Sequence, residues 1–466
     1  MSLSDAIIQG RNSEITAFIQ AGHNLNYIDE YGFTPLIQAA IVKNYEVAAL
    51  LLKHGAQVDI LDISGLTALH WAIDNDHLSL CELFLAHHAD PNSYTAHAQP
   101  ALFLPILRNH QQLKALLLRY GADIDFAQDY INAKLIGHRF ELQGYSDIVT
   151  PNGSFISIDL EGFYLEFTIG IIRDALEKFI NSYVANRYQL PLMEIQQIIR
   201  TLHNAALLRE YKHFSKAKNI DSYITNIQQL INMDLLMLPI SYKGHAITLV
   251  KHGRFLAKCD RGVHKMTDPI AIHTINRPQN LTLEFYKKLL YQRQTKQFMQ
   301  GGLYSQLALM PFVKLPIRHQ ITGNCSWANV EACIPTMLFM LRFDSLKDKN
   351  QFPKLIQQTM QFYQLWLEWD KDRALEDCIK DFEQANHNRK KAKAALLGVI
   401  LFQACDQHKP KDLKRAQKIL NILKQKEYHY IIRSYINVFL KGRSGHYAKN
   451  FYAVLKACNF NLNDFA

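Results

Sequence analysis

Residues 31–59 read YGFTPLIQAAIVKNYEVAALLLKHGAQVD, and variants of this stretch recur along the first quarter of the chain. One series of equivalent positions is spaced by 33 residues: Gly22, Gly55, His88 and Gly121. A second series keeps the same period, since GFTPLIQAA at 32–40 matches GLTALHWAI at 65–73 and, more loosely, AQPALFLPI at 98–106. Two series that agree on one period indicate stacked supersecondary units rather than a single globular core.

Each unit has the local chemistry of a helix pair. Thr34 and Thr67 can cap the first helix through a side-chain oxygen, and small Ala39 and Ala72 let paired helices approach closely. The glycines suit the left-handed position after the second helix. The pattern resembles ankyrin repeats, and the resemblance implies four units: residues 1–27 (a truncated cap), 28–60, 61–93 and 94–126. His88 replaces the glycine of the third unit, and the fourth is degenerate.

Ankyrin stacks recognise proteins and carry no chemistry of their own. The resemblance therefore implies a protein partner held by the hairpin tips and the concave helical face. The candidate partner-binding residues are Tyr27, Asp29, Tyr31, Asp62, Tyr94 and His97. His70, within TALH, is expected to form internal hydrogen bonds rather than to bind a metal.

Composition narrows the remaining classes of function. The seven cysteines are scattered and form no C-x-x-C pair, which argues against a disulfide framework or a zinc module and favours a reducing compartment. The net charge of +10 comes from basic residues diluted among acids, so nucleic-acid binding is not expected. No apolar run reaches the roughly 20 residues of a membrane helix. We expect a monomer without cofactor or metal, and the N-terminus lacks the layout of a cleavable export signal.

Residues 238–262, LPISYKGHAITLVKHGRFLAKCDRG, are typical of two strands joined at His252-Gly253. If those two residues form the turn, Lys251 pairs with Arg254 and, counting outward, His245 lies opposite Asp260. Opposed side chains on one face of a sheet are roughly 5 Å apart at Cβ. A carboxylate in that place fixes the imidazole tautomer and stabilises its charged form, as a general base for a thiol requires.

The thiol is expected in HQITGNCSWANVEACIPTM, residues 319–337. Cys325 follows a turn and precedes a predicted helix, interrupted at Pro335, that runs from Ser326 to Leu341. A helix N-terminus lowers the pKa of a thiol through its dipole and unpaired N–H groups. Gln320 can donate an amide hydrogen to an oxyanion beside the sulfur. The alternative is structural: an inert core thiol, two ordinary strand residues and a loop glutamine.

The order His245, Asp260, Gln320, Cys325 resembles that of cysteine peptidases of the adenovirus-protease and ubiquitin-like-protein-protease group, whose scaffold also carries effector acetyltransferases. Together with the degenerate repeats and the segments LIGHRFELQG and GNCSWAN, the chain resembles AnkH-like ankyrin effectors of intracellular bacteria. The resemblance implies type IV translocation, a place in the host cytoplasm or nucleus, and thiol chemistry on a host protein. An acyltransferase on this scaffold and a catalytically silent scaffold that acts by binding alone remain alternatives.

After residue 345 only helical patterns remain: 351–369, 372–386, 390–407, 411–425, 427–441 and 446–458. The predicted fold is therefore mixed, in three parts. An all-α ankyrin solenoid with a closing helix occupies residues 1–145, an α+β cysteine-protease-like domain occupies 146–344, and a helical bundle occupies 345–466.

Overall fold

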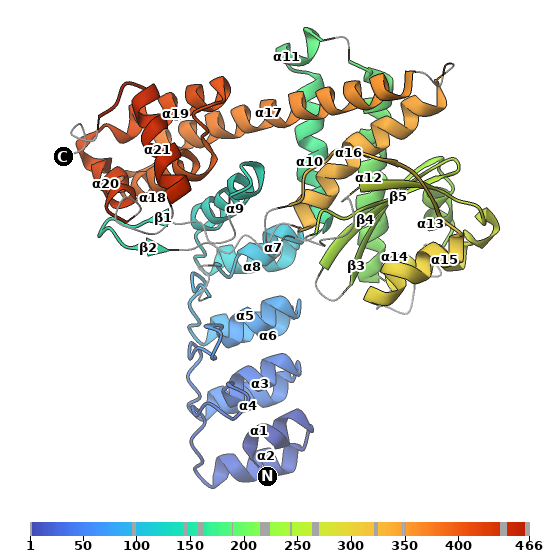
Figure 1. The fold of residues 1–466 in the computed structure, drawn as a ribbon. Coiled ribbons are helices and arrows are strands. Elements are labelled where there is room, and N and C mark those ends of the chain that lie inside the picture. Colours follow the sequence, from blue (N-terminus) through green and yellow to red (C-terminus); the bar gives the residue numbers. More distant parts are fainter. Residues whose placement is uncertain are drawn as a thin grey trace. The chain divides into compact units, whose positions relative to one another are not determined.

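The structure is a computed structural model (Figure 1), and it separates the chain into two compact units, Met1–Leu135 and Ile136–Ala466. It describes residues 2–95, 99–142, 148–156, 163, 165–188, 190–214, 224–242, 245–262, 270–320, 325–346, 348, 351–438 and 445–461.

The first unit is a row of antiparallel helix pairs. The pairs are α1 (Leu3–Ile8) with α2 (Asn12–Gln20), α3 (Pro35–Ile41) with α4 (Tyr45–Lys53), α5 (Ala68–Asp74) with α6 (Leu78–Ala86), and α7 (Phe103–Leu107) with α8 (Gln111–Arg119). A longer helix, α9 (Ile124–Arg139), follows and crosses the division between the units. The four predicted helix pairs and the closing helix are thus present.

The predicted local signals of these repeats are confirmed. The hydroxyls of Thr34 and Thr67 accept hydrogen bonds from the backbone N–H groups of Ile37 and His70, and so cap α3 and α5. The backbone turns left-handed after each second helix, with φ of 76° at Gly22, 93° at Gly55, 65° at His88 and 90° at Gly121. His88 therefore adopts a conformation that its repeat normally reserves for glycine.

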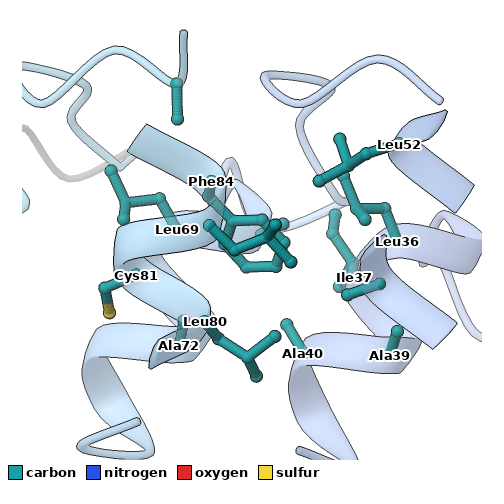
Figure 2. Packing of buried hydrophobic residues seen from close by; sticks show 14 of the residues in the cluster. Leu36, Ile37, Ala39, Ala40, Leu52, Leu69, Ala72, Leu80, Cys81 and Phe84 are labelled. Carbon is teal, nitrogen blue, oxygen red and sulfur yellow. The ribbon is translucent and has the colours of Figure 1, made fainter. Parts of the chain in front are cut away.

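The core of the first unit lies between neighbouring helix pairs. Leu36 and Leu69 are 1% and 0% exposed, and Ala39 and Ala72 are fully buried. Figure 2 shows the side chains of the second and third repeats meeting in the space between their helices. His70 is buried, and its Nδ1 lies 2.9 Å from the Thr67 hydroxyl, so it has the internal role predicted for it.

The second unit is built on a five-stranded antiparallel sheet in the order β3-β4-β5-β6-β7. Its strands are β3 (Leu235–Tyr242), β4 (His245–His252), β5 (Phe255–Cys259), β6 (Ile270–Thr274) and β7 (Met310–Lys314). A separate two-stranded ribbon pairs β1 (Ile148–Val149) with β2 (Phe155–Ile156). The segment predicted as two β-runs thus contributes three strands, because β3 and β4 also pair as neighbours.

Helices cover both faces of the five-stranded sheet (Figure 1). One face packs on a cluster that includes residues of α12 (Leu192–Phe214), α13 (Ile224–Ile231), α14 (Leu283–Tyr291) and α15 (Leu303–Leu307). The other face carries α16 (Cys325–Asp344), which also packs on α10 (Leu165–Ile180), a neighbour of the short α11 (Tyr183–Asn186).

Helix α16 is buried on every side from Ser326 to Leu341. Such a helix belongs to the centre of a domain rather than to its surface. The interruption predicted at Pro335 is absent, because the helix continues through that residue. Burial of the whole helix between sheet and helices outweighs the one backbone hydrogen bond that proline removes.

The remaining helices are α17 (Phe352–Gln384), α18 (His387–Val399), α19 (Pro410–Leu423), α20 (His429–Val438) and α21 (Gly445–Ala457). The two helices predicted over 351–369 and 372–386 are one continuous helix. The polar stretch between them is held by ion pairs from Arg373 to Asp370 and Asp377 at helical spacing. Helices α16 and α17 pack together across the expected boundary near residue 344. The third domain therefore stays a prediction.

Candidate active site

Cys325 is the first residue of α16 and the one cysteine of the seven that is not buried. The other six thiols are buried, and burial raises the pKa of Cys81 to about 12 and also raises that of Cys458. A partly exposed thiol at a helix N-terminus is the arrangement expected of a nucleophile.

The imidazole of His245 and the carboxylate of Asp260 are hydrogen-bonded, with Nε2 and Oδ1 2.9 Å apart. The predicted register is wrong by one turn residue, because the turn consists of Gly253 and Arg254 and His252 pairs with Phe255. Gly253 has a φ of 51°, which a hairpin turn favours at its first position. Counting outward, His245 lies opposite Gly262, and Asp260 is its diagonal neighbour.

His245 and Asp260 still meet because the residue opposite His245 changes by two positions, from the predicted 260 to 262. Side chains of a strand alternate between faces, so a shift of two keeps Asp260 on the face of His245. A glycine opposite His245 leaves space for the contact. A Cβ at position 262 would lie 3.1 Å from Asp260 Oδ1 and 3.4 Å from His245 Cε1.

The hydrogen bond between His245 and Asp260 stabilises the charged form of both side chains. The pKa of His245 is raised to about 9, first by its hydrogen bond to Asp260 and then by one to Cys325, while burial opposes the rise. Burial alone would raise the pKa of Asp260, but the hydrogen bond from His245 and the charge of Lys258 hold it at about 2. Since Nε2 faces Asp260, the imidazole is left with Nδ1 for the sulfur.

The same contacts act on the thiol. Burial by itself raises the pKa of Cys325, but hydrogen bonds from His245 and from the backbone N–H groups of Ala246 and Ser326 outweigh it. The net pKa lies below that of an ordinary cysteine. The three groups can therefore hold a thiolate and an imidazolium together near neutral pH.

Gln320 is tied to this region by its backbone. Its N–H donates to the carbonyl oxygen of Arg261, the residue after Asp260, at 2.9 Å. Its side-chain oxygen is buried. The predicted donation of its amide to an oxyanion stays a prediction, and residues 321–324 lie outside the described part of the chain.

A largely buried polar network surrounds the start of α16, and nothing in the sequence indicated it. The guanidinium of Arg261 bonds Glu331 at 3.1 Å and Glu141 at 3.0 Å. Trp327 donates from Nε1 to Glu331 at 3.2 Å. Acidic and basic residues far apart in sequence give no local signal of such pairing.

The end of α9 contacts the same helix. The ring of His138 stacks on Trp327 with 5.6 Å between centroids, and the guanidinium of Arg139 lies 5.2 Å from that ring. Arg139 also pairs with Asp370 of α17 at 2.8 Å, with both side chains buried. Residues 136–142 thus belong structurally with the thiol site.

The predicted partner-binding residues fall into two groups. Asp62 is buried, and its carboxylate accepts hydrogen bonds from Ser64, Leu66 and Trp71, so it holds its own hairpin together. Asp29 plays the same part through Tyr31, Phe33 and Gln38, and the Tyr27 hydroxyl bonds Ser4.

Tyr31 and Tyr94, in contrast, are 52% and 61% exposed. His97 lies outside the described residues. Sequence reasoning missed Ile28 and Leu61, which are 52% and 49% exposed and precede Tyr94 at successive intervals of one repeat. The period of 33 residues was the signal that could have found them.

Known proteins resemble the chain at two scales. The family model for ankyrin repeats, in three copies, matches residues 3–95. A solved structure of the Legionella effector AnkH matches with 40% sequence identity and a TM-score of 0.70, covering 99% of this chain and 98% of that one. The chain belongs to the AnkH family. Because that similarity spans both units, the thiol site lies inside the region shared with AnkH.

Two curated relatives match about a quarter of this AnkH-family protein and less than a third of their own length. An ankyrin repeat protein of Fowlpox virus is 31% identical over 127 residues, 27% of this chain and 29% of its own length. The nuclear factor NF-kappa-B p105 subunit of Gallus gallus is 30% identical over 125 residues, 26% of this chain and 13% of its own. Ankyrin repeats in such varied proteins indicate protein–protein interaction.

Among the residues that the structure describes, no three or more His, Cys, Asp or Glu side chains are grouped as a metal would require. No helix of the described part combines the length and apolarity of a membrane span.

Proposed function

We propose that the protein is a bacterial effector that binds a host protein through its ankyrin repeats and acts on it with the Cys325–His245–Asp260 site, as a cysteine peptidase does. The observation that carries the proposal is the position of the His245 imidazole, which is hydrogen-bonded to the Asp260 carboxylate at 2.9 Å and lies close enough to Cys325 to lower the pKa of that thiol. Delivery into the host cell follows from the likeness to a Legionella effector. A type IV system is the proposed route, and the host cytoplasm or nucleus is the proposed place of action.

The proposed reaction has two steps, formation of a thioester on Cys325 and its hydrolysis. The Cys325 thiolate attacks a peptide carbonyl carbon, and the resulting oxyanion collapses to a thioester as the C–N bond breaks. The His245 imidazolium gives its proton to the departing amine and then, as a neutral imidazole, takes a proton from the water that hydrolyses the thioester. Asp260 keeps the ring oriented and stabilises its charge. Gln320 is the proposed oxyanion donor.

The alternative is a scaffold that binds the host protein without cleaving it. Its supporting observation is the partial burial of Cys325, which limits access to the sulfur. An acyltransferase would use the same thiol with a different acceptor in place of water.

Selective alkylation separates an activated thiol from a silent one. We expect iodoacetamide to modify Cys325 before any other cysteine, with a midpoint well below the roughly 8.5 of an ordinary thiol. For each unit that the pKa falls, the thiolate fraction at pH 6.5 rises about tenfold while its nucleophilicity falls about threefold, so the rate gains about threefold. The rate of alkylation is measured by alkylating the protein at pH values between 5 and 9 and quantifying the modified tryptic peptides by mass spectrometry.

The direction in which peptidase activity changes with pH follows from the ionisation of Cys325 and His245. Peptidase turnover needs thiolate and imidazolium together, so it should rise through the pKa of Cys325 and fall through that of His245, which is about 9. His245→Gln should move the alkylation midpoint upward, toward an ordinary thiol. A wild-type midpoint near 8.5 or above would contradict the peptidase proposal and favour the scaffold.

Partner capture should depend on the exposed hairpin residues. Tyr31→Asp with Tyr94→Asp should weaken capture of the host protein by about tenfold or more, because aromatic side chains dominate binding energy at interfaces. The melting temperature should hold, since both rings are exposed.

Asp62→Lys is the contrasting variant. It removes an acceptor used by three hydrogen bonds inside the hairpin, so it should lower the melting temperature as well. Full capture by the double tyrosine variant would place the binding surface elsewhere.

A further inference from the structure

Asn329 lies one helical turn after Cys325 on α16 and is fully buried. Both ends of its amide are used. Its Oδ1 accepts a hydrogen bond from the backbone N–H of Arg261 at 2.6 Å, and its Nδ2 donates to the carbonyl oxygen of Ala246 at 2.6 Å. A buried amide in an otherwise mainly apolar helix face is costly unless it is satisfied in this way.

The two backbone groups it holds are neighbours of the proposed catalytic residues. Ala246 follows His245 on β4, and its backbone N–H is one of the groups that lower the pKa of Cys325. Arg261 follows Asp260, and its carbonyl oxygen accepts the N–H of Gln320. One side chain therefore joins the helix of the thiol to the strand of the imidazole and to the segment of the carboxylate.

We propose that Asn329 is the positioning residue of the thiol site: it sets the placement of His245 and Asp260 relative to Cys325. The inference rests on the proposed function, since it concerns the same thiol. Asn329 acts through Ala246 and Arg261.

The geometry distinguishes this role from general support of the core. A hydrogen bond that only stabilised α16 could join it to any buried partner. Asn329 instead holds the two backbone positions that directly follow His245 and Asp260. Loss of the amide should therefore change the ionisation of the thiol as well as the stability of the fold.

The matched control is Asn450 in α21. Its Nδ2 donates to the Cys405 carbonyl at 2.8 Å, and its Oδ1 accepts from the Gln407 N–H at 3.2 Å, so it makes the same two bonds away from Cys325. Asn329→Leu and Asn450→Leu each remove one such pair at nearly constant shape. The reference is His245→Gln, which removes the imidazole itself.

The experiment measures the pH profile of iodoacetamide alkylation at Cys325 in full-length chains, together with thermal melting. Both leucine variants should melt earlier. Only Asn329→Leu should move the alkylation midpoint upward, by about one unit toward that of His245→Gln, which slows alkylation at pH 6.5 by about threefold. If Asn329→Leu does not fold, Asn329→Ser is measured instead, with the same expected result. Serine is smaller than asparagine, so it leaves room for water to bond the Arg261 N–H and the Ala246 carbonyl oxygen.

Three results would count against these claims. An unchanged midpoint in a folded Asn329 variant, beside a low wild-type midpoint, would reduce Asn329 to a structural residue and leave the proposed function standing. An ordinary midpoint already in the wild type would remove the proposed function itself. Equal shifts in the Asn329 and Asn450 variants would show a general loosening and also overturn the positioning role.

Discussion

Replacing Cys325 with alanine is expected to abolish the action of the protein on its host target while leaving capture of that target intact. Loss of a covalent nucleophile removes the step that the other groups assist, so the rate should fall on the order of 10⁴-fold to 10⁶-fold. Capture should persist, because the repeats that are proposed to bind lie in the other compact unit.

The measurement is a count of new protein N-termini in a host-cell lysate after incubation with wild-type or variant chain. Cys458→Ala is the control, since that thiol is buried and has a raised pKa. Identical sets of new termini from wild type and Cys325→Ala would assign the effect to binding alone and support the scaffold alternative.

Replacing Leu69 with aspartate is expected to unfold the ankyrin unit. The side chain is 0% exposed and lies among the buried residues between repeats (Figure 2). Truncating a buried leucine costs about 3–5 kcal/mol, and burying an unpaired carboxylate adds to that cost. A domain has only about 5–15 kcal/mol in total, and each repeat depends on its neighbours.

Circular dichroism of the full chain during heating should then show one transition lost or shifted to low temperature. Ile63→Asp is the matched control, because Ile63 belongs to the same repeat but is 76% exposed. Melting of Leu69→Asp at the wild-type temperature would contradict the packing described for the repeats.

The ankyrin repeats could be predicted from the sequence because their signals are local and repeated. Thr34, Thr67 and the glycines at 22, 55 and 121 act within their own turns, and a fixed period reports them several times over. The role of Asp62 inside its hairpin had no such repeated signal. Its partners Ser64, Leu66 and Trp71 are set by the fold of the hairpin.

The meeting of His245 with Asp260 was predicted for a partly wrong reason. The turn was placed one residue early, yet the alternation of a strand makes facing insensitive to a shift of two positions. The contacts of Asn329 and Arg261 could not be predicted from the sequence. Asn329 bonds Arg261 and Ala246, which lie 68 and 83 residues away along the chain. Arg261 bonds Glu331 and Glu141, which lie 70 and 120 residues away. No spacing rule relates such positions before the chain is folded.

The contacts made by the end of α9 decide where the chain can be cut in deletion studies. A shortened protein that starts after residue 145, the predicted edge of the repeats, lacks the ring that stacks on Trp327 and the carboxylate that pairs with Arg261. Its inactivity would be mistaken for loss of target recognition. A cut at residue 135, the boundary between the two units, retains His138, Arg139 and Glu141, so that deletion separates recognition from chemistry.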